Sequence, residues 1–377
     1  MSPTIVRRNI SMSVDANPPE LRQPEQFREG CRTEKGSHGR PPSATYLGMK
    51  AYPANRLTLR LLTSILSIVG FLACPVMLSA ENAPRPATGR VVAITFDDLP
   101  YASEGSGISA KAAIDAQHRI VQTLRQAHVP ATGFANEDKV IALGPVGPRL
   151  LAEWNKGLLA LGNHGYSHFD SNDLNAESIE REVVKGETTI RPMAASVGRA
   201  IPFFRFPYNH TGDTESKRAA IEKLLADHGY TLAASTIDTS DYLFNNAYER
   251  AFAKRDKAMM RRIKHAYLDH SRLQIAYYGE LGRKVVGREV PAIMLLHANR
   301  LNSATIGQLL ALFRSAGYGF VSLTEAQRDP AYSTPVAATK FGPMWAYRWA
   351  RARHVKVDGR LEQEPPTWIG AYASGTP

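Results

Sequence analysis

The stretch Val91–Asp98 reads Val-Val-Ala-Ile-Thr-Phe-Asp-Asp, so a mostly β-branched apolar run ends in two adjacent carboxylates. Such a run is typical of a strand that is buried on both faces of a parallel sheet. In α/β proteins, the reactive groups lie at the C-terminal ends of such strands. Because neighbouring carboxylates repel each other, the pair indicates a bound metal or one acid that holds a proton. Taken alone, the Asp-Asp pair is more simply interpreted as a solvated turn after the strand. The motifs in the rest of the chain distinguish between these interpretations.

Strand-like and helix-like segments alternate after this first strand. We expect further strands at 129–134, 158–161, 201–204, 230–237, 292–296 and 319–323, and helices over 109–127, 147–155, 175–190, 214–228 and 304–316. Repeated β-then-α units predict an α/β fold with a largely parallel sheet, which is either open or closed into a barrel.

Residues 246–289 interrupt this alternation with a charged, amphipathic stretch. We interpret it as a helical insertion that lies over the barrel, with residues 251–270 forming one long helix. Its Met259, Met260 and Tyr267 are more typical of packing than of a ligand site. Residues 330–377 carry three tryptophans and several arginines, and we expect this C-terminal tail to pack on the domain.

The N-terminal 80 residues are interpreted as a leader. Residues 1–48 are polar and without periodicity, which predicts disorder or an extension upstream of the true start. Residues 49–80 resemble a signal peptide: Arg56 and Arg60 precede the apolar segment 61–80, and cleavage would follow Ala80. The segment is also long enough to span a bilayer uncleaved. The protein is therefore expected to be exported, either released to the periplasm or outside the cell, or anchored in a membrane.

Charge and cysteine content exclude two classes of function. Residues 1–80 hold 10 Lys and Arg and 5 Asp and Glu, which leaves 36 and 30, a net charge of +6, for residues 81–377. This mild excess contains no basic run of the kind that binds nucleic acid, so no nucleic-acid partner is expected. Both cysteines, Cys31 and Cys74, lie in the leader. The mature chain therefore has no thiol chemistry, and any metal ligands must be His and carboxylate.

Four further clusters each follow a strand-like segment. In the first, Gly162–His168, the two histidines are four residues apart and would lie one turn apart on a helix. Together with Asp98, His164 and His168 would form a two-His, one-carboxylate face with open positions for a metal. A histidine pair alone is more often structural. The other clusters are Arg205–Asn209, Asp238–Tyr242 and Leu295–Ala298.

In this order, the five clusters resemble the motifs of the polysaccharide deacetylases with the NodB homology domain, the fourth carbohydrate esterase family. The motifs are TFDD, the two-histidine loop, RFPY, DxxDY and LLH, within a catalytic domain over about residues 89–325. The resemblance implies a distorted (β/α) barrel with about seven strands. It also implies metal-dependent hydrolysis of N- or O-acetyl groups on a polysaccharide or oligosaccharide.

Carried over by position, the resemblance implies a role for each motif residue. Asp98, His164 and His168 would hold the metal, commonly zinc. Asp97 would be the general base and Arg205 its partner, while His297 would be the general acid, oriented by Asp241. The Tyr208 backbone N–H would bind the oxyanion, and Tyr242 would form an aromatic wall beside the substrate.

Several positions depart from the family pattern. Leu99 stands in place of Gly, Gly165 in place of Ser or Thr, Asn209 in place of Gly, and Tyr242 in place of Trp. None of these changes removes a metal ligand or a proton carrier, but they leave the substrate class open. Two alternatives remain: a hydrolase of a small non-sugar amide, and an inactive barrel that binds glycans. Among the other histidines, His210 is the one expected near the substrate.

Overall fold

The computed structural model describes residues 89–102, 107 and 109–375, and the strands of this part form one parallel sheet. Every pairing between its strands is parallel, in the order β5-β4-β3-β2-β1-β6, with β7 paired to the start of β1. The strands are β1 (Val91–Leu99), β2 (Ala131–Ala135), β3 (Leu159–Asn163), β4 (Phe203–Phe204), β5 (Thr231–Leu232), β6 (Ala292–His297) and β7 (Gly319–Val321).

The sheet curls back on itself beyond β5. Ile237 forms a parallel bridge with Met294 of β6, although β6 is at the other end of the strand order. The backbone N–H of Leu295 donates to the carbonyl of Ile237 at 3.0 Å, and the N–H of Thr236 donates to Ile293 at 2.9 Å. The predicted distorted (β/α) barrel is therefore confirmed.

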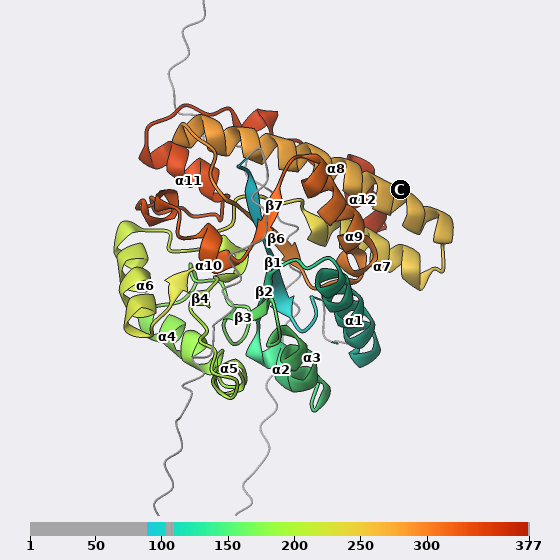
Figure 1. Cartoon of the computed structure of the whole chain (residues 1–377), viewed down its shortest axis with the longest axis horizontal. Helices are drawn as coiled ribbons and strands as arrows, with labels where there is room; N and C mark the ends of the chain where they lie inside the picture. Colours follow the sequence, from blue (N-terminus) through green and yellow to red (C-terminus); the bar gives the residue numbers. More distant parts are fainter. Residues whose placement is uncertain (1–88, 103–106, 108, 376–377) are drawn as a thin grey trace, which may run out of the picture. The chain divides into compact units, whose positions relative to one another are not determined.

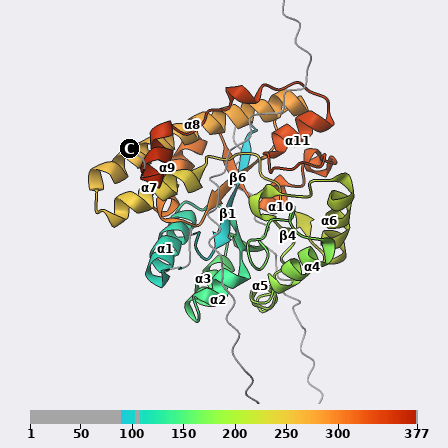
Figure 2. The same ribbon diagram turned by 180° about the vertical axis from the view of Figure 1, so that it is seen from behind.

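Helices surround the strands in both views of Figures 1 and 2. Half of the described α-helices begin where a short polar side chain accepts a hydrogen bond from the first turn, as Ser109, Asn175, Thr214 and Asn299 do. The α-helices are α1 (Ala110–Gln126), α2 (Glu137–Ala142), α3 (Val146–Trp154), α4 (Ala176–Lys185), α5 (Ile190–Ala195), α6 (Glu215–Asp227), α7 (Asp241–Ala253), α8 (Lys257–Val286), α9 (Arg300–Ser315), α10 (Leu323–Ala326), α11 (Trp345–Ala352) and α12 (Thr367–Ser374).

The single helix expected over residues 251–270 is wrong. Helix α7 ends at Ala253, and Arg255 adopts a left-handed φ of 54°. The N–H of Asp256 then donates to Ala251 and that of Arg255 to Phe252, which is the Schellman arrangement that terminates a helix. The Asp256 side chain caps α8 by accepting from the N–H of Met259. The strand expected over 230–237 is also shorter, because only Thr231 and Leu232 pair as β5.

Helices α7 and α8 share a hydrophobic cluster with the C-terminal tail. Tyr267 is completely buried there, with Met259 and Met260 packed against the cluster, as expected of packing residues. Ile369 of α12 belongs to the same cluster, and Figure 1 shows α12 beside α7 and α9. The tail therefore packs on the helices that follow the Asp238–Tyr242 motif.

The leader predictions fall on residues that the structure does not describe. These include the apolar segment 61–80 and both cysteines. Within the described residues, no helix is both long and apolar enough to cross a membrane.

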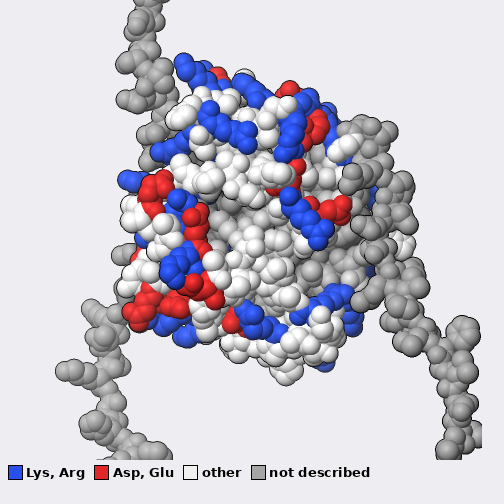
Figure 3. All heavy atoms as spheres, turned by 60° about the vertical axis from the view of Figure 1, so that its left-hand side comes forward, with Lys and Arg blue, Asp and Glu red and all other residues white. Residues whose placement is uncertain are grey.

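Acidic and basic side chains alternate on the face shown in Figure 3. Ion pairs also form within α4 and α6, among them Arg181–Glu177 and Lys223–Asp227. Charges of opposite sign are thus interspersed on this part of the surface.

Candidate active site

The register of the sheet brings the motif residues to one end of the barrel. Asp97 of β1 is paired with His297 of β6, while Asn163 at the end of β3 is paired with Phe204 of β4. Because all of these strands are parallel, their C-terminal ends lie at the same edge, and so do the residues that directly follow them. Asp98 lies at the C-terminal end of β1, and His164 and Arg205 directly follow β3 and β4.

Asp98, His164 and His168 form a group that could hold a metal ion. One ligand atom from each lies within 4.8 Å of the others. The Nε2 atoms of His168 and His164 are 3.4 Å and 3.9 Å from Asp98 Oδ1. His164 Nδ1 is 2.8 Å from the carbonyl oxygen of Arg205, which fixes Nδ1 as the donor and leaves the Nε2 lone pair facing the group.

The electrostatics of this group suit a cation. Burial lowers the pKa of His164 and lowers that of His168 to about 4, so both imidazoles are neutral at pH 7, as metal ligands must be. Burial alone would raise the pKa of Asp98, but the charges of Lys139 and of the nearby histidines hold it well below its usual range. The carboxylate is therefore ionised.

Lys139 of α2 is a neighbour of this group that the sequence analysis missed. Its Nζ lies 2.8 Å from Asp98 Oδ1, and both side chains are largely buried. The contact has the distance of an ion pair without the angles of a hydrogen bond, so Asp98 Oδ1 has no hydrogen-bond donor among the described residues. The sequence signal was modest: Lys139 follows the end of a strand by four residues, as site residues of α/β proteins often do.

The two histidines are held by a loop, which corrects the expected helix. Residues 164–168 contain no helical turn, and both Gly165 (φ 82°) and His168 (φ 53°) are left-handed. A Cβ on Gly165 would come within 2.7 Å of Phe169, so the glycine is required here. Asn163 Oδ1 accepts from the N–H of Gly165 at 2.8 Å, and Asn136 Nδ2 donates to the carbonyl of His164 at 2.8 Å.

Arg205 and Asp97 form a buried ion pair. Arg205 Nη1 donates to Asp97 Oδ1 at 2.8 Å and to Thr95 Oγ1 at 2.7 Å. Its Nη2 donates to the carbonyl of Ala234 at 2.8 Å, and the guanidinium lies 4.4 Å from the centre of the Phe134 ring. The arginine is thus fixed from several directions and in turn fixes one oxygen of Asp97.

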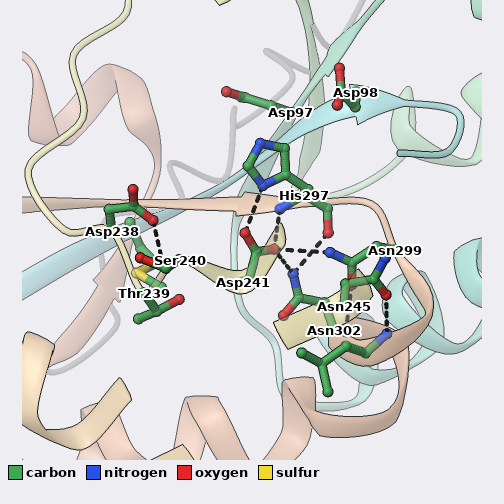
Figure 4. A network of polar contacts seen from close by, with 12 residues as sticks. Asp97, Asp98, Asp238, Thr239, Ser240, Asp241, Asn245, His297, Asn299 and Asn302 are labelled. Carbon is green, nitrogen blue, oxygen red and sulfur yellow. Dashed lines mark hydrogen bonds and ion pairs between the residues drawn. The ribbon is translucent and has the colours of Figure 1, made fainter. Parts of the chain in front are cut away.

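His297 and Asp241 form a second pair (Figure 4). His297 Nδ1 is 2.7 Å from Asp241 Oδ1, and the backbone N–H of His297 donates to Oδ2 at 2.8 Å. Asn299 and Asn302 also donate to Oδ2, and neither was anticipated from the sequence. Burial acts to lower the pKa of His297, but Asp241 beside it raises this pKa to about 10. In the view of Figure 4, the imidazole has Asp241 on one side and Asp97 and Asp98 on the other.

Two tyrosines border this group of residues. The ring of Tyr208 stands 4.8 Å from that of His168, and the ring of Tyr242 stands 6.2 Å from that of His297. Their exposed fractions are 43% and 41%, so both present aromatic surface to the solvent beside the site. The ring of His210 lies 5.6 Å from that of Tyr208, and His210 Nδ1 is 2.7 Å from Asp170 Oδ1.

Residues 85–233 match the family model described as polysaccharide deacetylase. This part of the chain belongs to the polysaccharide deacetylase family. The family resemblance is thereby confirmed, and the first three of the five motifs lie within the matched residues.

Individual relatives are more distant. The peptidoglycan-N-acetylglucosamine deacetylase of Listeria monocytogenes is 22% identical over 267 residues, which cover 70% of this chain and 44% of the relative. The chain thus matches less than half the length of this curated relative. Among solved structures, a family 4 carbohydrate esterase from Streptomyces lividans in complex with acetate has a TM-score of 0.39 and 18% identity, over 63% of this chain and 95% of its own. A pseudoenzyme of the same family from Bacillus anthracis has a TM-score of 0.43 and 18% identity, over 63% and 64%.

Two of the departures from the deacetylase pattern, Gly165 and Leu99, have local structural reasons. Gly165 provides the left-handed turn of the histidine loop, and Ser167 supplies a hydroxyl instead: its N–H and Oγ donate to Glu182 at 2.8 Å and 3.0 Å. Leu99 is completely buried against Gly133, where a Cβ would lie 2.2 Å from Leu99 Cδ1. The larger side chain at position 99 is therefore accommodated by the small one at position 133.

Proposed function

We propose that this protein is a metal-dependent hydrolase that removes acetyl groups, N-acetyl groups in particular, from a cell-wall or extracellular polysaccharide or oligosaccharide. The observation that supports it most is the arrangement of two different ion pairs around one ligand group. Asp97 is paired with Arg205 and His297 with Asp241, and both lie beside Asp98, His164 and His168. Metal-assisted amide hydrolysis uses this combination of a base, an acid and a cation.

Asp98, His164 and His168 are proposed to hold the cation. One carboxylate and two neutral imidazoles with open positions suit Zn²⁺. The carboxylate oxygen Asp98 Oδ1, buried without a hydrogen-bond donor, supports this assignment. When bound, a divalent cation would supply Lewis acidity for the acetyl carbonyl and would make a water molecule more acidic.

Asp97 is proposed to be the general base that accepts the proton of the attacking water. Its Oδ1 is occupied by Arg205, so Oδ2 is the oxygen that remains for the proton. Oδ2 lies 3.9 Å from His164 Nε2, which places it beside the proposed cation ligands. The guanidinium thereby holds the carboxylate in one orientation, with Oδ2 left for the proton.

His297 is proposed to be the general acid that protonates the leaving amine. Asp241 accepts the Nδ1 proton, so the second proton of the imidazolium is on Nε2 and can be donated. A cation bound nearby would lower the pKa of His297 from about 10 toward neutrality, where an imidazolium is an effective acid.

The tetrahedral oxyanion is proposed to receive a hydrogen bond from the backbone N–H of Tyr208. Losing one such donor typically costs about 3 kcal/mol of transition-state stabilisation. The exposed rings of Tyr208 and Tyr242 would flank the sugar, and flat apolar rings of this kind suit the faces of pyranose units.

The substrate class rests on the relatives and on the leader. The relative from Listeria monocytogenes is a peptidoglycan N-acetylglucosamine deacetylase, which favours an N-acetylated cell-wall glycan as substrate. The apolar segment 61–80 with its basic flank favours export, either with cleavage or as a membrane anchor.

The test is acetate release by the purified full-length chain from chitooligosaccharides, peptidoglycan and acetylated xylan. We expect release from at least one N-acetylated glycan, loss of that release after chelation, and recovery with Zn²⁺. The variant Asp97→Asn, which has nearly the same shape, serves as a control for contaminating deacetylases. If metal-loaded protein released no acetate from any of these glycans, the small-amide hydrolase or the glycan-binding barrel would be favoured instead.

A further inference from the structure

Arg348 of α11 is a buried guanidinium outside the motifs. It is 1% exposed, and burial lowers its pKa to about 10. No ion pair with a carboxylate is found for it in the described part of the chain, and its guanidinium lies 4.7 Å from the centre of the Trp345 ring. A buried charge without a counter-ion is costly, and an apolar side chain of similar volume usually gives a more stable fold. Such a residue therefore calls for an explanation beyond stability.

The hydrogen bonds of Arg348 lead to the loop that carries Tyr208. Nη2 donates to the carbonyl oxygen of Asn209 at 2.6 Å, and Nη1 donates to Thr211 Oγ1 at 2.7 Å. Nε donates to the carbonyl of Pro343 at 3.0 Å, within the tail itself. The planar guanidinium thus joins the tail to two positions of the loop in a geometry that a lysine ammonium cannot reproduce.

This loop has a backbone conformation that needs support. Tyr208 and Asn209 are both left-handed, with φ of 59° and 54°, and two successive non-glycine residues rarely adopt this region. Asn209 is tied further by its side chain, since Asn209 Oδ1 accepts from Ser235 Oγ at 3.0 Å. The Ser235 carbonyl in turn accepts the N–H of Trp345, at the start of α11.

The tail also approaches the Tyr208 backbone directly. A Cβ on Gly342 would come within 1.8 Å of the carbonyl oxygen of Tyr208, so only glycine permits this contact. The loop is therefore packed against Gly342 on one side and hydrogen-bonded to Arg348 at the next residue. Both contacts come from the C-terminal tail, more than 100 residues beyond the segment 85–233 that matches the family.

We propose that Arg348 is a positioning residue of the deacetylation site, which holds the Tyr208–Asn209 backbone so that the Tyr208 N–H faces the reacting carbonyl. The inference rests on the proposed function, because the N–H matters only if an oxyanion forms. Arg348 touches no reacting atom; it acts through the carbonyl of Asn209. The C-terminal tail is accordingly a working part of the site rather than a cover on the barrel.

The consequence is a specific kinetic defect. Removal of an oxyanion donor lowers kcat by about 10²–10³-fold, and a donor displaced by about 1 Å loses a comparable part of its effect. We expect Arg348→Met to lower kcat by about 10²-fold while KM stays near the wild-type value. Arg348→Lys should recover only part of this loss, because it restores the charge without the second loop contact.

The experiment compares wild type, Arg348→Met, Arg348→Ala and the control Arg353→Ala, whose side chain is exposed five residues further along. Three readouts are taken: kcat and KM for acetate release, rescue of Arg348→Ala by millimolar methylguanidinium, and hydrogen exchange of the backbone amides of residues 206–211. We expect the kcat defect, a several-fold rescue, and faster exchange confined to that loop. The control should show none of these effects.

Three outcomes would overturn the proposal. The first is a kcat of Arg348→Met within twofold of wild type. The second is a kcat defect that methylguanidinium does not rescue in Arg348→Ala and that comes with faster exchange throughout the barrel, as expected of a purely structural residue. Unchanged exchange in residues 206–211 would also contradict it, and this readout does not depend on activity. If the wild-type protein itself released no acetate, the proposed function would fail, while the exchange experiment would still decide whether Arg348 holds the loop.

Discussion

Replacing Asp241 by Asn should change the protonation of His297 while keeping the shape of the site. Asp241 Oδ2 accepts three N–H donors, from the His297 backbone, Asn299 and Asn302. In the variant, the amide oxygen must take the Oδ2 position because the amide nitrogen cannot accept these bonds. The amide NH₂ then faces His297 Nδ1, which has to be unprotonated to accept from it.

The size of the effect follows from the pKa of His297. Asp241 raises this pKa from 6.5 to about 10 against the effect of burial, and Asp98 and Asp97 contribute less. Without Asp241, burial should bring the pKa to 6.5 or below. The change of about 3.5 units corresponds to an upper limit of about 5 kcal/mol. At pH 8, the protonated fraction of His297 in chelator-treated protein would fall from nearly all to about 3%. Turnover of the zinc-loaded enzyme should fall in the same direction, because less of His297 is then protonated to act as the acid.

Two measurements test this reasoning. The first is an NMR titration of His297 in chelator-treated protein, and the second is the pH dependence of kcat in the zinc-loaded enzyme. We expect the titration midpoint and the alkaline limb of kcat to move to lower pH in Asp241→Asn. Asp170→Asn, which removes a similar Asp–His pair with His210, is the control and should leave both unchanged. An unshifted His297 midpoint in Asp241→Asn would refute the assignment.

The same shift predicts a pH dependence of stability. Because the folded state raises the pKa of His297, the stabilisation is fully present below pH 6.5 and is lost as the pH rises through about 10. The free energy of unfolding of chelator-treated wild type should therefore fall over this range. In Asp241→Asn, this part of the fall should be absent in urea unfolding experiments.

Two further variants test the charges around the site. Lys139→Met should bind Zn²⁺ about tenfold or more tightly in chelator competition, since unit charges 4 Å apart interact by about 4 kcal/mol at an effective dielectric constant of 20. Weaker binding would mean that the ammonium assists the cation. The control is Lys223→Met, which changes an exposed lysine. Asp238→Asn should be more stable than wild type at pH 8 but not at pH 4, because burial raises the pKa of Asp238 to about 6 and its ionised form costs up to about 3 kcal/mol. Equal unfolding free energies of Asp238→Asn and wild type at pH 8 would show that burial of the ionised Asp238 carboxylate does not destabilise the fold.

The parallel sheet could be predicted because its strands are continuous apolar runs, as in Ala292–Leu296, that end in polar motifs. The site residues at strand ends followed from the same pattern, since register alone brings Asp97 beside His297. The family resemblance added the roles, which spacing by itself does not determine. Apolar runs and the polar motifs that follow them are local in sequence, so they can be recognised without knowing how distant segments pack.

What the sequence could not predict depends on backbone conformation and on distant contacts. The spacing of His164 and His168 fits a helical turn, but the left-handed Gly165 and His168 produce the same approach in a loop. The break after α7 had a signal in Asp256, a good helix cap, yet the apolar periodicity continues across it. The contact of Arg348 with Asn209 joins residues 139 positions apart and has no signature in either segment.

The central claim is that cation binding and proton donation belong to different residues of one site. The most direct test measures zinc content and acetate turnover on the same preparations of wild type, Asp98→Ala and His297→Ala. The account predicts that Asp98→Ala loses both, while His297→Ala keeps its zinc and loses turnover by about 10²-fold or more. Full zinc occupancy in Asp98→Ala, or near wild-type turnover in His297→Ala, would contradict it.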